Sequence, residues 1–219
     1  MAPMSEPRAQ IAIVDYGMGN LRSAAKALEH VGAAVIVTSR RSELLEADAL
    51  VLPGVGAFPE AMRRIEERSL AAPIRERVGS GAPLLGICLG MQLLFEFSDE
   101  HGGAAGLGLL PGRVEAMDVS GAGDLKLPHI GWSNVEPRLQ GPLTAGLAPE
   151  GDPFYFVHSF VARPEPAHLL ATSAHGREFA AIVGDGNVFG TQFHPEKSSA
   201  AGLRMLSAFV AAVTPAGVA

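Results

Sequence analysis

The sequence predicts an α/β protein with an open, mostly parallel sheet, helices on both faces of that sheet and an antiparallel β extension. In the first half, short unbroken apolar runs alternate with helical patterns, which is typical of parallel strands buried on both faces. In the second half, strand-like segments are separated by turns rich in Gly and Pro. The chain has 219 residues, 47% of them hydrophobic, so it can form a core without disulfides or a structural metal. We expect a disordered leader over residues 1–10, a single domain over 11–213 and a tail over 214–219.

Four strands are predicted in the first half, over residues 11–14, 35–37, 49–52 and 84–87. A helix follows the first strand, because apolar residues recur from Leu21 at helical spacing, with Asn20 as N-cap and Gly32 past its end. Residues 59–78 favour a helical segment interrupted at Pro73, and an apolar helix is predicted over 89–97. Residues 98–107, rich in Gly and acidic side chains, are expected to form a surface loop.

The second half favours strands over residues 112–119, 126–135, 154–161 and 168–193. A turn at 121–123 separates the first two of these segments, and the turn at 184–187 predicts a hairpin within the last. A final helix is predicted over 199–213, because Leu203, Leu206 and Phe209 recur on one stripe.

The charge balance excludes some classes of partner. The chain has 17 Lys and Arg against 23 Asp and Glu, for a formal charge of −6, and no basic cluster stands out. This argues against nucleic-acid or anionic-membrane binding, and the lack of a run of about 18 apolar residues predicts a cytoplasmic protein. Only 18% of the residues are charged, against about 25% in typical domains, so the surface is unusually apolar or partly covered by another molecule.

Cys88 is the only cysteine of the chain, which excludes an internal disulfide and a multi-thiolate metal site. It stands in Gly86-Ile87-Cys88-Leu89-Gly90, between a predicted strand and a predicted helix. The flanking glycines permit a sharp turn, and the helix N-terminus that follows favours the thiolate. A lone cysteine in an apolar run is more often a buried hydrophobe, but this strand-to-helix turn favours a nucleophile.

A nucleophilic cysteine needs a base and a group that orients the base. Among the seven histidines, His194 ends an apolar strand and is followed by Pro195 and Glu196. Proline favours an extended conformation in the preceding residue, which places His194 and Glu196 on roughly the same side of the backbone. The sequence therefore predicts His194 as the base and Glu196 as its orienting acid, with His158 as a competing histidine.

The oxyanion of a covalent intermediate needs hydrogen-bond donors. One candidate is the backbone amide of Leu89, directly after the nucleophile. The other is the loop Pro53-Gly54-Val55-Gly56-Ala57, which follows the third predicted strand and so lies on the same sheet edge. A Gly-rich loop can also cradle a phosphate, but no Lys-Ser/Thr pair follows this one.

The segments Gly86-Ile87-Cys88-Leu89-Gly90-Met91-Gln92 and His194-Pro195-Glu196 resemble the motifs of the triad-type (class I) glutamine amidotransferases. Within that family the sequence is similar to the glutaminase subunits of imidazole glycerol phosphate synthase. Supporting segments extend over almost the whole chain, at residues 15–20, 53–58, 106–109, 128–132, 155–160 and 194–198. The resemblance implies a flavodoxin-like fold that works without a cofactor or a metal.

The resemblance also implies roles for the matching residues. Cys88 would attack the carboxamide of glutamine, and His194, oriented by Glu196, would protonate the departing ammonia and then activate water. Residues expected to hold glutamine or its oxyanion are Gly54, Val55, Gly56, Leu89, Gly90, Gln92, His158, Ser159 and Phe160. In this set His158 is a structural member of a substrate-binding strand rather than a second base.

The glutaminase subunit of that family docks on a separate cyclase, which uses the ammonia to make imidazole glycerol phosphate and an aminoimidazole carboxamide ribotide (AICAR). The resemblance places Tyr16, Asn20, Trp132, Tyr155 and Lys197 in the contact surface. The family usually has Asn directly after this Trp, whereas Ser133 stands here, and the departure concerns the contact surface rather than the triad. Alternatives are a glutaminase serving another ammonia-dependent synthase and a stand-alone cysteine hydrolase that needs no partner.

Overall fold

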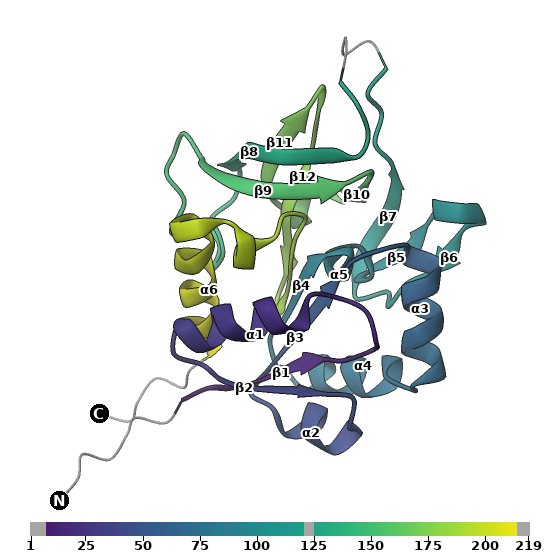
Figure 1. Ribbon diagram of the computed structural model, residues 1–219, viewed down its shortest axis with the longest axis vertical. Helices are drawn as coiled ribbons and strands as arrows, with labels where there is room; N and C mark the ends of the chain where they lie inside the picture. Colours follow the sequence, from purple (N-terminus) through teal and green to yellow (C-terminus); the bar gives the residue numbers. More distant parts are fainter. Residues whose placement is uncertain (1–7, 121–124, 214–219) are drawn as a thin grey trace, which may run out of the picture.

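The computed structural model describes residues 8–120 and 125–213. Within them the chain forms a nine-stranded sheet, a four-stranded sheet and helices on both faces of the larger sheet (Figure 1). The elements in chain order are β1 (Gln10–Val14), α1 (Leu21–His30), β2 (Ala34–Thr38), α2 (Arg41–Glu46), β3 (Ala49–Gly54), α3 (Phe58–Glu67), α4 (Ala71–Gly79), β4 (Leu84–Cys88), α5 (Leu89–Gln92), β5 (Phe95–Ser98), β6 (Ala104–Ala105), β7 (Leu110–Ala116), β8 (His129–Pro137), β9 (Asp152–His158), β10 (Phe160–Pro164), β11 (Leu169–His175), β12 (Arg177–Asp185), β13 (Val188–Thr191) and α6 (Ser199–Val213).

The strands β2-β1-β3-β4-β13 form the parallel part of the large sheet. Side chains of β1 alternate between two cores: Ile11 and Ile13 pack with residues of α1 and α6, whereas Ala12 and Val14 pack with residues of α2, α3 and α4. All four side chains are fully buried, which accounts for the unbroken apolar run. Figure 1 shows α1 and α6 together on one side of these strands and α3 and α4 on the other. The predicted parallel core with helices on both faces is confirmed.

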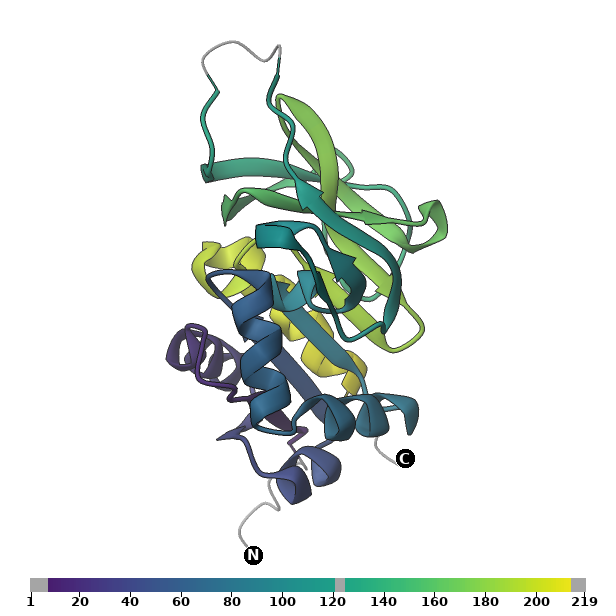
Figure 2. The same ribbon diagram turned by 90° about the vertical axis from the view of Figure 1, so that its right-hand side faces the viewer.

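The antiparallel extension continues from β13 through β12, β11, β8 and β9. In Figure 2 most of this extension, coloured from teal to yellow-green, lies above α3 and α4. β12 and β13 form the predicted hairpin, with Asp185 opposite Val188. Because β13 also pairs in parallel with β4, the strand that leads to His194 lies directly beside the strand that ends at Cys88.

The prediction of a helix over residues 89–97 is wrong beyond its first turn. α5 ends at Gln92, and β5 follows within the four-stranded sheet of order β10-β7-β5-β6. The backbone N–H groups of Leu107 and Leu109 donate to the carbonyls of Leu93 and Leu94, each at 2.8 Å. In a longer helix these carbonyls would accept hydrogen bonds from within the helix, but here they accept them from another segment. An apolar run alone does not distinguish a helix from a strand at this position.

The segment 98–107 is not simply the expected surface loop. Ser98 and Glu100 are buried, and a carboxylate oxygen of Glu100 accepts a hydrogen bond from the backbone N–H of Phe58 at 2.7 Å. Ala104 and Ala105 form β6. Of the two acidic residues in this segment, Glu100 is therefore held inside the fold and Asp99 is exposed.

The helical segment over 59–78 is divided at residues 68–70 rather than at Pro73. α3 ends at Glu67, Ser69 has a φ of 54° and α4 begins at Ala71. Pro73 lies in the first turn of α4, where a backbone N–H has no partner within the helix, so proline fits. The sequence pattern does not reveal α2, which has only 6 residues.

The sheet starts earlier than predicted, because β1 begins at Gln10 and Ala9 is already buried. The end of the expected leader is therefore part of the fold. The rest of that leader over 1–7, the tail over 214–219 and the turn at 121–123 lie outside the described residues. No helix in the described ranges is long and apolar enough to cross a membrane.

Candidate active site

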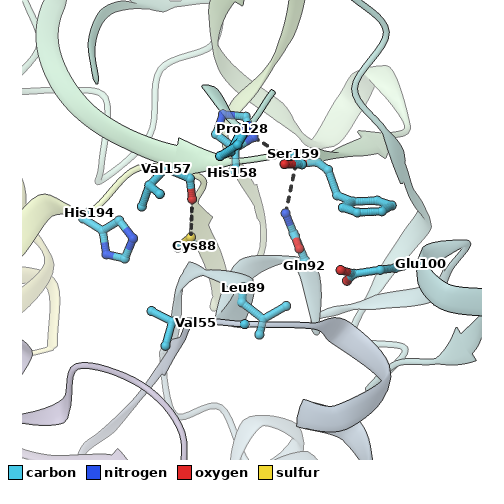
Figure 3. A pocket seen from close by; sticks show the side chains of 12 residues that line it. Val55, Cys88, Leu89, Gln92, Glu100, Pro128, Val157, His158, Ser159 and His194 are labelled. Carbon is cyan, nitrogen blue, oxygen red and sulfur yellow. Dashed lines mark hydrogen bonds between the residues drawn. The ribbon is translucent and has the colours of Figure 1, made fainter. Parts of the chain in front are cut away.

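A cavity of about 340 Å³ lies at the edge of the sheet where β3 and β4 end. Loops at the carboxyl ends of parallel strands converge at such an edge. Figure 3 shows Cys88 between His194 and Gln92, with Glu100 on the far side of Gln92. The lining residues come from well-separated parts of the chain: Val55, Gly56, Cys88, Leu89, Gln92, Glu100, Pro128, Val157, His158, Ser159, Phe160 and His194.

Cys88 ends β4 in a conformation that L residues rarely adopt, with φ 57° and ψ −113°. Its two flanking glycines allow this turn. A Cβ atom on Gly90 would lie 1.7 Å from the carbonyl oxygen of Leu52, and one on Gly86 would lie 2.6 Å from the carbonyl oxygen of Gly90. Only glycine fits at either position. Backbone strain of this kind costs about 1–3 kcal/mol and is typical of functional positions.

His194 and Glu196 form a buried pair beside Cys88. Nδ1 of His194 lies 2.8 Å from Oε1 of Glu196, so Nδ1–H donates a hydrogen bond to the carboxylate, which fixes which ring nitrogen faces the cavity. The other nitrogen, Nε2, is buried with no hydrogen-bond partner among the described residues. The predicted alignment of the two side chains across Pro195 is therefore present.

The backbone around His194 is also held firmly. Its N–H donates to the carbonyl of Tyr155 at 3.0 Å, and its carbonyl accepts from the hydroxyl of Ser198 at 2.6 Å. Burial lowers the pKa of His194, but Cys88 and Glu196 outweigh that effect and raise it to about 9. The imidazolium is thus the stable form at pH 7, and a positive charge beside a thiol favours the thiolate.

Tyr16 does not lie in a contact surface, contrary to the expectation. Its side chain is fully buried, and its hydroxyl donates to the carbonyl of Pro53 at 3.0 Å. Burial, and secondly the charge on Cys88, raise the pKa of Tyr16, so the phenol keeps the proton that it donates. Tyr16 therefore anchors the start of the 53–57 loop, in which Gly54 lies in register with Cys88.

Gln92 is committed to protein contacts through its nitrogen. Nε2 donates to the carbonyl of Phe160 at 3.1 Å and to Oε1 of Gln192 at 3.0 Å. Both amide hydrogens are used in this way, which leaves Oε1 as the atom of Gln92 that can meet a ligand.

His158 belongs to a chain of neutral rings. Its Nδ1 lies 2.9 Å from the carbonyl oxygen of Phe160, and its Nε2 lies 3.1 Å from Nδ1 of His129. Because a carbonyl only accepts, Nε2 of His158 must accept from His129. Nε2 of His129, 2.9 Å from the hydroxyl of Ser133, must then accept from Ser133.

Both rings of this chain are uncharged at pH 7. Burial lowers the pKa of His158 to about 3 and that of His129 to about 4. These hydrogen bonds occupy both ring nitrogens of His158, so this ring is not free to serve as a base. Ser133 donates inward to this chain, on the side of β8 opposite to Trp132.

An exposed apolar surface borders the cavity on the β8–β9 ribbon. We call it the Trp132 face, made of Ile130, Trp132 and Tyr155. Trp132 is 53% exposed, and its ring centroid lies 6.1 Å from that of Tyr155. Ile130 lies in register with Val157, which lines the cavity. Lys197 is exposed and Asn20 is partly exposed, so these two predicted contact residues are accessible, unlike Tyr16.

Sequence reasoning missed two residues of the site. Glu100 lines the cavity, but its segment has the composition of a loop. Gln192 is fully buried, and its Nε2 lies 3.9 Å from Sγ of Cys88. The available signal was the period-two spacing of Gln192, His194 and Glu196. In the described ranges, no group of three or more His, Cys, Asp or Glu side chains could hold a metal ion.

The fold and the site define a class: α/β proteins in which a cysteine at a strand-to-helix turn shares a cavity with a histidine paired to a glutamate. The family model for class-I glutamine amidotransferases matches residues 12–213. The chain belongs to the class I glutamine amidotransferase family.

Curated relatives and solved structures agree with this assignment. Imidazole glycerol phosphate synthase subunit HisH of Bacillus cereus (strain G9842) is 49% identical, over 91% of this chain and 93% of the relative. The protein of the same name from Moorella thermoacetica is 48% identical, over 94% and 97%. The structure of PurLQS from Thermotoga maritima has a TM-score of 0.71 at 20% identity, covering 94% of this chain and 100% of that chain. That likeness shows a common fold.

Proposed function

We propose that this chain is the glutaminase subunit of an imidazole glycerol phosphate synthase. It hydrolyses glutamine to glutamate and ammonia, and it passes the ammonia to a cyclase that makes imidazole glycerol phosphate and AICAR in histidine biosynthesis. The observation that carries the proposal is the meeting of Cys88 and His194 in one cavity, with Glu196 hydrogen-bonded to the imidazole. Relatives that are 48% and 49% identical have the name of a subunit of that synthase.

In this proposal Cys88 is the nucleophile. Its thiolate attacks the side-chain carboxamide carbon of glutamine, and the carbonyl electron pair moves onto oxygen. As the tetrahedral intermediate collapses, the C–N bond breaks and Nε2 of His194 gives its proton to the nitrogen, so ammonia leaves and a glutamyl thioester remains. Water then attacks the thioester, His194 takes a proton from that water, and glutamate and the Cys88 thiolate are released.

The oxyanion is proposed to bind at the backbone. Leu89 lines the cavity directly after the nucleophile, so its amide is the first donor. The second donor comes from the 53–57 loop, where Val55 and Gly56 line the cavity. Gly56 has a φ of 95°, a conformation open to glycine, so this peptide has freedom to turn when the partner binds.

Glutamine carries an α-ammonium group as well as its carboxamide. Glu100 places a carboxylate in the cavity, on the side away from His194 (Figure 3), and we assign it to the α-ammonium group. Oε1 of Gln92 and the backbone at Ser159 and Phe160 supply further polar contacts along the cavity wall. A peptide substrate whose α-nitrogen is acylated has no charge to offer Glu100, which disfavours a peptidase.

The proposed cyclase contact is the Trp132 face together with Asn20 and Lys197. This surface borders the cavity through the register pair of Ile130 and Val157. This surface is also bonded to the backbone of His194, because the carbonyl of Tyr155 accepts a hydrogen bond from the N–H of His194. A partner seated there would keep ammonia out of water, where it becomes ammonium and loses its nucleophilicity. The low charged fraction of the chain suits such a contact.

The experiment is co-purification with a candidate cyclase, followed by synthesis assays with glutamine or ammonium salts as the nitrogen source. We expect Cys88→Ala to abolish glutamine-dependent synthesis while synthesis from ammonium salts persists. Loss of both activities would mean that Cys88 is structural. The isolated chain should hydrolyse glutamine slowly and accelerate when the cyclase and its ligand are added.

Rapid partner-independent cleavage would favour a stand-alone cysteine hydrolase, and acceleration by a different synthase would favour another glutaminase. The proposal includes one amidotransferase domain over residues 11–213 and a cytoplasmic location. A reducing compartment keeps a lone thiol such as Cys88 unoxidised.

A further inference from the structure

Two buried glutamines connect the β10 end of the cavity to the sulfur of Cys88. Nε2 of Gln92 contacts the carbonyl of Phe160 at 3.1 Å and Oε1 of Gln192 at 3.0 Å. Nε2 of Gln192 then lies 3.9 Å from Sγ of Cys88. The chemistry described above accounts for Cys88 and for a ligand contact by Gln92, but it gives no role to Gln192.

The direction of these hydrogen bonds is fixed by their far end. A backbone carbonyl only accepts, so the atom of Gln92 that faces Phe160 must be nitrogen. That same nitrogen faces Gln192, whose contacting atom must therefore be oxygen. The remaining end of the Gln192 amide is nitrogen, and this nitrogen faces the sulfur. Turning either amide over would place two acceptors or two donors against each other.

The carbonyl of Phe160 is itself fully occupied. It accepts from Nδ1 of His158 at 2.9 Å as well as from Gln92, which uses both of its lone pairs. His158 is in turn held by His129. The orientation of the two glutamines is thus tied to the β8–β9 ribbon rather than to the glutamines alone.

Besides His194, Sγ of Cys88 has two polar neighbours with opposite preferences. The carbonyl of Val157, at 3.8 Å, accepts a hydrogen bond from the thiol and so favours the protonated form. The N–H of Gln192 suits the thiolate, because a donor stabilises negative charge on sulfur. His194 and the buried Tyr16 are the ionisable groups that interact electrostatically with Cys88, and among the described residues neither side chain forms a hydrogen bond with the side chain of Gln192.

We propose that Gln192 is a catalytic residue that donates a hydrogen bond to the Cys88 sulfur, favours the thiolate and aims it into the cavity, with Gln92 holding the Gln192 amide in the donating orientation. The proposal rests on the proposed function for its role in turnover. Gln92 then has two roles. Its Nε2 fixes the orientation of the Gln192 amide, and its Oε1 faces the ligand.

The test uses the full chain and measures alkylation of Cys88 by iodoacetamide as a function of pH. Cys88 is the only cysteine, so every alkylation event reports on this sulfur. The variants are Gln192→Leu, which removes the donor, and Gln192→Glu, which replaces it with a carboxylate of the same shape. Gln140→Glu is the matched control, because Gln140 is exposed.

In Gln192→Leu we expect the midpoint of the alkylation profile to move up by about one pH unit, and the rate at pH values well below the midpoint to fall about tenfold. Gln192→Glu should move the midpoint further, because a carboxylate repels the thiolate. The control should match the wild-type profile. A wild-type midpoint in either folded variant, with folding checked by near-ultraviolet circular dichroism, overturns the proposal.

A second measurement needs no altered side chain at the site. The chain has four glutamines, Gln10, Gln92, Gln140 and Gln192, so the side-chain amides can be followed by NMR in the wild-type protein. The chemical shift of one buried amide proton should change as Cys88 ionises, and this change should disappear after alkylation. If no amide proton responds to the ionisation of Cys88, the proposal is contradicted. Neither measurement uses glutamine turnover or a cyclase, so failure of the proposed function would leave both readouts intact.

Discussion

His194 and Glu196 meet at 2.8 Å, Nδ1 to Oε1, with side chains that are only 2% and 3% exposed. Pro195 separates them in sequence and keeps both on one side of the backbone. Because Nδ1–H donates its hydrogen bond to the carboxylate, Nε2 is the nitrogen that can exchange a proton with the thiol or the leaving group. The carboxylate of Glu196 therefore influences both the charge and the tautomer of the imidazole.

Glu196→Gln should lower kcat for glutamine hydrolysis by about 10²–10⁴-fold, because an amide can stabilise the wrong tautomer and cannot balance the imidazolium. The KM for glutamine should change little, since Glu196 is not among the cavity-lining residues. Steady-state assays with the cyclase present measure both constants. Glu67→Gln on α3, where the side chain is 58% exposed, is the control, and a Glu196→Gln rate within tenfold of wild type would contradict the assignment.

The raised pKa of His194, about 9, predicts a basic limit to activity. Above pH 9 the imidazole is neutral and cannot protonate the departing ammonia, so kcat/KM should fall there. The free energy of unfolding should also fall at high pH. The contribution of His194 to it is complete below the ordinary histidine pKa of about 6.5 and is lost as the pH rises through about 9. Rate profiles from pH 6 to 10 test this, and an unchanged rate up to pH 10 would contradict it.

His129 and His158 predict the opposite behaviour in acid. Their pKa values are lowered to about 4 and about 3, so the unfolded chain binds more protons between those values and about pH 6.5. Their contribution is present above pH 6.5 and lost as the pH falls, by up to about 1.4 kcal/mol per pH unit for each ring. Urea unfolding at pH 7 to 4.5 should show this slope. It should decrease in His158→Gln and persist in a variant of the exposed His101, His101→Gln.

The backbone conformation of Cys88 predicts that replacement by glycine relieves strain at this position. Its φ of 57° is accessible to glycine but costly for a residue with a Cβ atom. Cys88→Gly should therefore be more stable than Cys88→Ala by about 1 kcal/mol, although both lack the thiol. Denaturant unfolding compares the two variants, and a Cys88→Gly protein less stable than Cys88→Ala would show that the turn is unstrained.

Trp132→Ala should weaken cyclase binding by about 30-fold or more, as expected for a central aromatic contact. Properties of the site that do not depend on the cyclase, such as the alkylation rate of Cys88, should stay unchanged. Val37→Ala is the control, because Val37 is also exposed but lies on β2, at the opposite end of the large sheet from β9. Calorimetric titration with the cyclase gives both affinities, and equal affinities would remove Trp132 from the contact.

Local patterns in the sequence were sufficient for the parallel strands of the large sheet and for the Cys88 turn. β1 and β3 are buried on both faces, so their apolar runs are unbroken, and the glycines around Cys88 are required by backbone contacts within a few ångströms. His194 and Glu196 were recognisable because the intervening proline constrains them locally. These features depend on neighbours in sequence.

Features set by distant contacts could not be predicted in this way. β5 forms because β6 and β7 pair with Phe95–Ser98, although the same apolar run also fits a helix. Tyr16 looks like a surface aromatic in a loop until the carbonyl of Pro53 accepts its hydroxyl. Gln192 gains its position only when Gln92, 100 residues earlier, meets it inside the fold.

β13 is the last strand of the described chain, yet it lies between β4 and β12. During synthesis, β4 therefore keeps an unpaired edge until β13 has been made. His194 follows Cys88 by 106 positions (194 − 88), a delay of roughly 5–20 s at typical rates of translation. Throughout that interval the thiol lacks the His194–Glu196 pair beside it. Under the proposed function, a half-made chain therefore lacks the groups that would activate its cysteine.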